Sequence, residues 1–422
     1  MNAEAAAPQS SSLGAEIAAR INELGAISET PDHLARIFLT PEHRAAADLI
    51  LGWMRAAGMR AHLDAIGNVC GRYEGQEPGM PSLMLGSHYD TVRDAGKWDG
   101  PLGILTAISC VAELNRRGRR LPFAIEVIGF ADEEGVRFAS TLLGSRAVAG
   151  TFDESVLGKS DAAGVTMRQA LAGFGLDPDH VGRAARTRRE LLAYVELHIE
   201  QGPVLEGLNT PLGVVTAISG ATRLAARLTG MAGHAGTVPM KQRKDALAGA
   251  AECIGAVEQF CRTDEDGLVG TVGYIHAAPG ATNVIPGQVS FTIDIRAPGD
   301  AHRKRAVADM VRQIETIARR RDLALQLDVT HENRSVPCAD WLKSQIAGAI
   351  AAEGYPVVEL PSGAGHDGMA MIAIADVGMI FVRCRGGISH HPAEHVDTID
   401  VDAGARALLR MIENFRPRYL AQ

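Results

Sequence analysis

Short, almost wholly apolar runs alternate with helix-like segments through the first half of this 422-residue chain. Residues 82–87, 123–130 and 193–199 are predicted strands, and residues 103–115 have the apolar spacing of a helix. Strands this apolar are buried on both faces, which is typical of a mostly parallel sheet with helices on both of its faces. Ligands of such sheets bind beyond the carboxyl ends of the strands. We therefore expect an α/β fold whose functional side chains follow its strands.

The pattern changes between residues 217 and 333. Strand, helix, strand, strand, helix and strand are predicted there in that order, at 224–231, 245–261, 269–277, 287–296, from Asp300 onward, and at 323–329. This βαββαβ order is typical of a ferredoxin-like α+β module, with four antiparallel strands and two helices on one face. The alternating pattern then returns, with a helix near 339–353 and strands near 355–360 and 377–382. We expect residues 217–333 to be inserted into a domain that residues 1–216 and 334–422 form together.

Composition and charge exclude several classes of protein. The net charge is −8 and the basic residues are scattered, so we expect no nucleic-acid partner. The chain has no run of about 18 apolar residues, and residues 1–14 lack the pattern of a secretion signal, so we expect no membrane partner either. The six cysteines form no CxxC pair, which favours reduced thiols and a cytoplasmic protein.

Residue types that bind metals gather where the predicted strands end. They are His88 and Asp90 after 82–87, Asp99 before 103–115, Glu133 and Glu134 after 123–130, His198 in 193–199, and His390 after 377–382. Each also has a structural interpretation, since Asp often caps helices, Glu suits a first helical turn, and histidines occur in cores. Because the carboxyl ends of parallel strands meet at one edge, the whole set favours a site for two divalent cations bridged by one carboxylate.

Three consecutive acidic residues, Asp132, Glu133 and Glu134, follow the second of these strands. Like charges at the end of a buried strand repel one another unless a cation compensates them. Adjacent side chains are not expected to point the same way, so we expect one glutamate to bind metal and the other to act as a base. Asp90 is expected to accept a hydrogen bond from the ring nitrogen of His88 that does not bind metal.

Nine segments of the chain carry a resemblance to a known family. In chain order they are GSHYDTV, KWDGPLG, ADEEGVRF, ELHIEQGPVLE, AGHAGTVPM, TNVIPG, FTIDIR, SGAGHDG and GGISHHPAE. They resemble the hydantoinase/carbamoylase family of amidases, which belongs to the aminoacylase/carboxypeptidase superfamily of two-metal hydrolases. The similarity runs from about residue 20 to about residue 415. The family includes N-carbamoyl-L-amino-acid hydrolases, β-ureidopropionases, allantoate amidohydrolases and ureidoglycolate hydrolases.

The resemblance implies a set of site residues. His88, Asp99 and His198 would bind one metal ion, and Asp99, Glu134 and His390 the other, with Asp99 bridging and Glu133 as the general base. His391, beside His390, is the alternative ligand. His234, Asn283 and Arg296 would bind substrate, and Gln201 and His366 would line the cleft. His234 would reach the active site of the neighbouring subunit, which implies a homodimer formed through the inserted lid and dimerisation module.

The implied activity is hydrolysis of the ureido C–N bond of a small carboxylate, either an N-carbamoyl-L-amino acid or allantoate. Two divalent ions per subunit would activate water and polarise the ureido carbonyl; Zn²⁺ and Mn²⁺ are expected, and Co²⁺ and Ni²⁺ are also compatible. His234 is suited to stabilise the oxyanion, by about 3–4 kcal/mol, and Arg296 to bind a substrate carboxylate. Because both residues belong to the inserted module, catalysis should require the two domains to close.

Two other functions are compatible with this sequence. A dipeptidase or aminoacylase would use the same metal chemistry on an acyl substrate, and a catalytically silent binding protein would keep only the fold. The intact set of predicted ligands together with Glu133 argues against the silent protein. Arg383 and Arg385, which precede His390, either favour a polar substrate such as allantoate or have a structural role.

Overall fold

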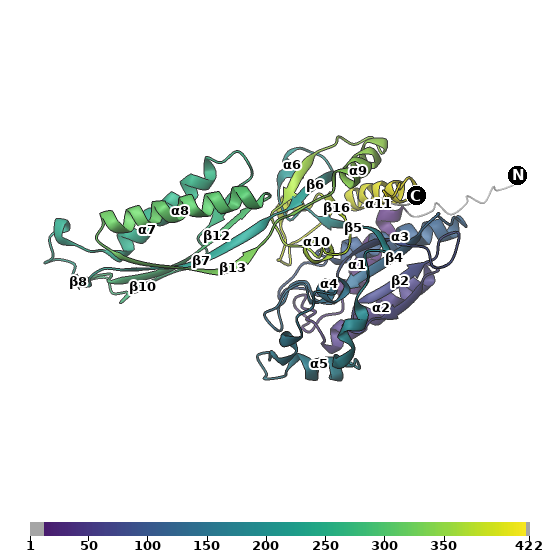
Figure 1. Cartoon of the computed structure of the whole chain (residues 1–422), viewed down its shortest axis with the longest axis horizontal. Coiled ribbons are helices and arrows are strands. Elements are labelled where there is room, and N and C mark those ends of the chain that lie inside the picture. The colour runs from purple at the N-terminus through teal and green to yellow at the C-terminus, as the bar shows by residue number, and fades with distance from the viewer. Residues whose placement is uncertain (1–11, 419–422) are drawn as a thin grey trace, which may run out of the picture. The chain divides into compact units, whose positions relative to one another are not determined.

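The computed structural model describes residues 12–418, and Figure 1 shows its elements along the chain. The chain divides into two compact units. The larger unit includes the chain up to Thr216, Cys338–Leu360 and the chain from His366 onward, and the smaller unit comprises Ala217–Pro337 and Pro361–Gly365. Residues 1–11, part of the segment for which no secretion signal is predicted, lie outside the described residues, as do residues 419–422.

Within residues 12–418, the largest sheet has nine strands. Its order is β1 (Arg60–Leu63), β2 (Val69–Tyr73), β4 (Ala124–Phe130), β3 (Ser82–His88), β5 (Leu191–Ile199), β16 (Val377–Val382), β6 (Leu212–Ile218) and β14 (Val336–Pro337), and β15 (Glu359–Ser362) also pairs with β6. The central strands β4, β3, β5 and β16 run parallel, which confirms the predicted α/β fold with a central parallel sheet. The outer pairs are antiparallel, so the sheet is parallel only at its centre.

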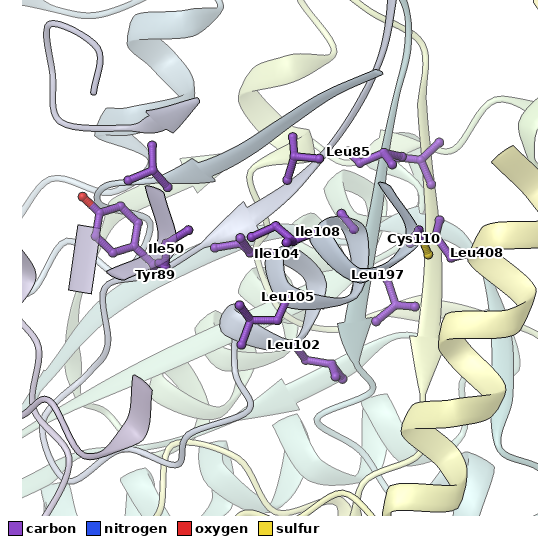
Figure 2. Packing of buried hydrophobic residues seen from close by; sticks show 14 of the residues in the cluster. Ile50, Leu85, Tyr89, Leu102, Ile104, Leu105, Ile108, Cys110, Leu197 and Leu408 are labelled. Carbon is purple, nitrogen blue, oxygen red and sulfur yellow. The ribbon is translucent and has the colours of Figure 1, made fainter. Parts of the chain in front are cut away.

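Helices of the larger unit pack on this sheet and on one another. They are α1 (Leu13–Gly25), α2 (Pro41–Ala56), α3 (Pro101–Arg116), α4 (Leu143–Val148), α5 (Met167–Gly173), α6 (Val204–Gly207), α9 (Asp340–Ala352), α10 (Gly368–Met371) and α11 (Thr398–Glu413). Every residue of β3, β4 and β5 is buried, as expected for central strands covered by other elements. Figure 2 shows Ile104, Leu105 and Ile108 of α3 in this core, with Leu85 of β3 and Leu408 of α11.

The smaller unit contains an antiparallel sheet and two long helices. In the described part of the chain its sheet has the order β10 (Ile275–Ala278), β12 (Gln288–Ala297), β7 (Gly220–Thr229) and β13 (Ala324–Asn333), and β9 (Val269–Thr271) also pairs with β12. The helices are α7 (Ala246–Arg262) and α8 (Asp300–Arg320), and Figure 1 shows both on one side of the sheet. The strand predicted at 269–277 is thus divided into β9 and β10, which pair with different parts of β12.

The alternating strand β12 explains how this sheet binds its helices. Val289, Phe291, Ile293 and Ile295 are buried in one cluster with residues of α7 and α8. A short ribbon of β8 (Gly233–His234) and β11 (Val284–Ile285) belongs to the same unit. A side-chain period of two therefore gives this sheet one apolar face for the helices to cover.

The structure also shows the state of the cysteines and the character of the helices. All six cysteines are free and buried, and Cys110 and Cys253 lie in the two apolar cores. Across residues 12–418, no helix combines the length and apolar character needed to cross a membrane.

Candidate metal centre

His88 and His198 lie at the ends of adjacent strands. His88 is the last residue of β3, and His198 precedes the last residue of β5, which pairs with β3 in parallel. Both side chains are buried. Their Nε2 atoms lie 3.4 Å and 3.1 Å from the same oxygen of Asp99, Oδ1. The two histidines and Asp99 form a group whose potential ligand atoms all lie within 4.8 Å of one another.

Asp99 lies in the turn before α3 and does not cap that helix, since the N-cap is Gly100. The structural interpretation of Asp99 as a helix cap is therefore wrong. Gly100 has a φ of 80°. A Cβ at this position would lie 2.4 Å from the carbonyl oxygen of His88 and 2.7 Å from its ring. Glycine is needed here because it allows both the backbone conformation and the close approach of the Asp99 turn to β3.

The other oxygen of Asp99 faces a second group. Its Oδ2 lies 3.2 Å from Nε2 of His390, and the same nitrogen lies 3.3 Å from Oε1 of Glu134. The potential ligand atoms of these three residues also lie within 4.8 Å of one another. Nδ1 of the neighbouring His391 instead accepts a hydrogen bond from the Ala393 backbone. Asp99 is thus shared by two groups, one on each of its oxygens.

The side chains of Glu133 and Glu134 do not diverge, contrary to the prediction from the sequence. A carboxylate oxygen of each lies within 4.8 Å of the other and of a ring nitrogen of His88. β4 ends at Phe130, so both glutamates lie beyond the strand, and the alternation of side chains in strands does not apply to them. The carboxylate of Asp90 accepts hydrogen bonds from both of their backbone N–H groups, at 3.0 Å and 3.2 Å.

Asp90 also lies beside the ring nitrogen of His88 that faces away from Asp99. Its Oδ1 is 3.4 Å from Nδ1, and its backbone carbonyl oxygen is nearer, at 3.1 Å. The contact expected from the sequence is therefore shared between the side chain and the backbone of Asp90.

Two buried residues that hold these segments, Arg36 and Glu394, were not predicted from the sequence. Arg36 donates a 2.7 Å hydrogen bond from Nε to the carbonyl of Tyr89, between His88 and Asp90. Glu394 accepts hydrogen bonds from the Asp99 turn. The signal for Arg36 was a lone charged residue inside the apolar run LARIFL, whereas the signal for Glu394 was its position four residues after His390.

The electrostatics of the cluster fit divalent cations. The Asp99 carboxyl is buried, which would raise its pKa, but hydrogen bonds from His198, His390 and His88 outweigh this effect and lower it. Burial and the neighbouring Glu134 carboxylate raise the pKa of Glu133 well above its usual value. Nδ1 of His198 lies 2.9 Å from the backbone carbonyl oxygen of Ile199, which leaves Nε2 directed at Asp99. Buried imidazole nitrogens grouped with carboxylate oxygens are the donor set that such cations bind.

Gln201 and His366, the two residues expected to line the cleft, lie against the same cluster. Nε2 of Gln201 donates to Asp99 Oδ2 at 2.8 Å and to Ser389 Oγ at 3.0 Å. Gln201 and His390 both have positive φ, 56° and 53°, a strained conformation for these residue types that is frequent at functional sites. The ring of His366 packs edge-on against that of His198, with centroids 4.5 Å apart.

The three residues expected to bind substrate from the inserted module lie in the smaller unit. The β8–β11 ribbon brings His234 and Asn283 together, because the N–H of Ala235 donates to the Asn283 carbonyl at 2.9 Å. Arg296 donates from Nε and Nη2 to the two oxygens of Asp294, at 3.0 Å and 3.1 Å, and from Nη1 to the Gly363 carbonyl at 2.8 Å. The Nε and Nη2 side of the Arg296 guanidinium is therefore already hydrogen-bonded to Asp294.

Arg383 has the structural role that was one of its two interpretations. Its Nε and Nη2 donate to the two oxygens of buried Asp400, at 2.9 Å and 2.8 Å. This pair joins the end of β16 to α11. Arg385 is exposed and donates to Asp397 at 2.7 Å.

Comparison with known proteins supports the same interpretation. A model of peptidase family M20/M25/M40 matches residues 84–414. Allantoate deiminase of Arabidopsis thaliana is 43% identical, over 94% of this chain and 82% of that protein. N-carbamoyl-L-amino acid amidohydrolase of Geobacillus stearothermophilus is 41% identical, over 93% of this chain and 96% of that protein. The crystal structure of a hydantoinase/carbamoylase family amidase from Burkholderia multivorans is 33% identical, with a TM-score of 0.89, over 94% of this chain and 97% of that one.

The fold, the grouped metal-ligand residues and these similarities define a metal-dependent hydrolase. The chain belongs to peptidase family M20/M25/M40, within which its relatives include the hydantoinase/carbamoylase amidases. The resemblance found in the sequence is thereby confirmed.

Proposed function

We propose that this protein hydrolyses the ureido C–N bond of a small carboxylate, with allantoate and N-carbamoyl-L-amino acids as its two candidate substrates. The proposal rests on the contacts of the two carboxylate oxygens of Asp99. Oδ1 faces His88 and His198, whereas Oδ2 faces His390. Two relatives of more than 40% identity are an allantoate deiminase and an N-carbamoyl-L-amino acid amidohydrolase.

His88, Asp99 and His198 would hold one divalent ion, and Asp99, Glu134 and His390 the other. Mixed imidazole and carboxylate ligands accept Zn²⁺ or Mn²⁺, and also Co²⁺ or Ni²⁺. When bound, two such ions supply Lewis acidity, which matters here because both nitrogens of a ureido group donate electrons into its carbon.

Glu133 is the proposed proton carrier. It lies beside Glu134 and His88 but belongs to neither of the two groups that share Asp99. The pKa of its carboxyl is raised by burial and by the charge of Glu134, which favours a group that first accepts and then donates a proton. Glu133 would take the proton of the attacking water and deliver it to the leaving nitrogen, which departs as ammonia.

The smaller unit would supply the contacts with substrate. His234 would stabilise the oxyanion of the tetrahedral intermediate, and Asn283 would bind the ureido carbonyl or the carboxylate of the substrate. An arginine has five N–H donors, and three of those of Arg296 are used by Asp294 and Gly363, so one N–H on each terminal nitrogen is left for a substrate carboxylate. We propose a homodimer in which His234 acts on the neighbouring subunit.

An ammonia-release assay tests this function directly. The metal-free protein is loaded separately with Zn²⁺, Mn²⁺, Co²⁺ and Ni²⁺ and offered allantoate, several N-carbamoyl-L-amino acids and β-ureidopropionate. Release of ammonia from at least one of them is expected. Dipeptides and N-acyl amino acids serve as the comparison, because release of amino acid from these alone would establish a dipeptidase or aminoacylase instead.

A further inference from the structure

Glu394 connects the two loops that carry Asp99 and His390. It follows His390 by four residues, and its side chain is buried, with 4% of the residue exposed. Oε1 accepts hydrogen bonds from the backbone N–H groups of Trp98, at 2.8 Å, and of Asp99, at 3.0 Å. Oε2 lies 3.1 Å from Oγ of Ser389. One carboxylate thus binds the backbone of one loop and a side chain of the other.

The Asp99 turn needs an acceptor at this position. α3 begins at Pro101, so the N–H groups of Trp98 and Asp99 precede the helix and are buried. Buried backbone N–H groups require a partner. A Cβ on Gly96 would lie 2.3 Å from the carboxyl group of Glu394, so the chain has a glycine where the glutamate approaches it.

The side chain of Asp99 is connected to the same glutamate through Ser389. Oγ of Ser389 lies 2.8 Å from Asp99 Oδ2, the oxygen that faces His390, as well as 3.1 Å from Glu394 Oε2. Gln201 donates to both Ser389 and Asp99. Asp99 is therefore held at its backbone N–H directly by Glu394 and at one carboxylate oxygen through Ser389.

We propose that Glu394 is a positioning residue, which orients the Asp99 carboxylate so that each oxygen faces one metal position. The inference rests on the proposed function, since it assumes that Asp99 bridges two ions. Hydrogen-bonded groups that orient a ligand contribute about 10- to 100-fold to metal affinity. Because Asp99 belongs to both groups, loss of Glu394 weakens binding at both positions.

The test is a titration of the metal-free protein with Co²⁺. Binding is measured from the ligand-field absorption of the bound ion and from competition with a chelating dye. Glu394→Ala removes the acceptor and is expected to weaken the binding of both ions about 10-fold or more. Glu394→Gln keeps an oxygen for the two backbone N–H groups, and its amide can donate to Ser389, which leaves the serine hydroxyl hydrogen for Asp99. Glu394→Gln is therefore expected to restore affinity to within a few-fold of wild type, on the order of a single neutral hydrogen bond.

Asp264 provides the matched control in the smaller unit. It is a mostly buried carboxylate that likewise accepts hydrogen bonds from two backbone N–H groups, those of Asp266 and Leu268. Asp264→Ala should lower thermal stability without changing Co²⁺ affinity. Wild-type affinity in Glu394→Ala, or equal losses in the alanine and glutamine variants, would overturn the positioning role. If wild type itself bound fewer than two ions per chain, the proposed function would fail instead, so the two failures are distinguishable.

Discussion

Asp99 is the residue on which the site depends, because its two oxygens face different groups of ligands. Oδ1 faces the histidines of two parallel strands, and Oδ2 faces His390 in the loop after β16. A carboxylate can divide its oxygens in this way only if its backbone and its rotamer are both held. Gly100 and the hydrogen bonds to Glu394 hold the backbone, and Ser389 and Gln201 contact Oδ2. The neighbouring glutamates are equally close to the cluster but have different proposed roles.

Exchange of each glutamate for glutamine separates these roles. Glu133→Gln cannot accept a proton, so kcat should fall by about 10²- to 10⁴-fold while two metal ions remain bound. Glu134→Gln removes a charged ligand, so bound metal should be lost. Steady-state ammonia release and elemental analysis of the same preparations measure both effects. Unchanged turnover in Glu133→Gln would contradict its role as the base.

Metal binding should release protons. In the metal-free protein, hydrogen bonds from the His390 ring to Asp99 and Glu134 raise the pKa of His390 to about 10, against 6.5 for an ordinary histidine. The protonated ring therefore stabilises the metal-free fold fully below about pH 6.5, and this stabilisation is lost as the pH rises towards 10. Cations bind the neutral ring, so binding at about pH 8 should displace at least one proton per chain.

Calorimetry in buffers of different ionisation enthalpy measures these protons. His390→Ala should release fewer protons than wild type, whereas the adjacent His391→Ala should release the same number. Identical binding enthalpies for wild type in all buffers would contradict the predicted release.

The buried central strands and the alternating β12 were predicted from the sequence, whereas the equally apolar β6 and the amphipathic helix α11 were not. The central strands are short apolar runs bounded by turn residues, and β12 alternates with a period of two; both patterns favour strands. The edge strand β1 has mixed polarity, and the strand predicted at 269–277 has a regular pattern but is divided in the structure. At the site, residue types predicted side chains that the structure groups around Asp99, whereas the hydrogen bonds from Arg296 to Asp294 depend on side-chain geometry that no residue pattern contains.

The contact between the end of β16 and α11 provides a test at the scale of secondary-structure elements. Arg383→Ala removes a bidentate pair with buried Asp400, so the free energy of unfolding should fall by about 1–3 kcal/mol. The ratio of kcat/KM for allantoate to that for an N-carbamoyl amino acid should not change. Denaturant unfolding and steady-state kinetics measure the two quantities. A large change in the ratio with unchanged stability would show that Arg383 selects the substrate.

At the scale of the whole molecule, the residues with proposed roles belong to two compact units. The proposed metal ligands and Glu133 belong to the larger unit, and His234, Asn283 and Arg296 belong to the smaller one. If His234 serves the neighbouring subunit, each active site of a homodimer needs both chains. Two inactive variants that are defective in different units should then complement one another.

Mixing Glu133→Gln with His234→Ala tests this arrangement. In a mixed dimer, the site with an intact Glu133 would receive the intact His234 of the other chain, so one of its two sites is active. Random exchange of subunits should recover up to about one quarter of wild-type ammonia release. Unmixed variants that undergo the same exchange serve as controls. Activity that stays at the level of the parents would place His234 in the site of its own chain.

The most direct test of the central claim is the number of divalent ions bound per chain, measured by elemental analysis of wild type and of Asp99→Ala after metal loading and dialysis. Two ions per wild-type chain are expected. Because Asp99 belongs to both groups, the alanine variant should lose both ions together. A wild-type protein with one ion or none, or an Asp99→Ala variant that retains two ions, would contradict the claim that this carboxylate bridges a two-metal site.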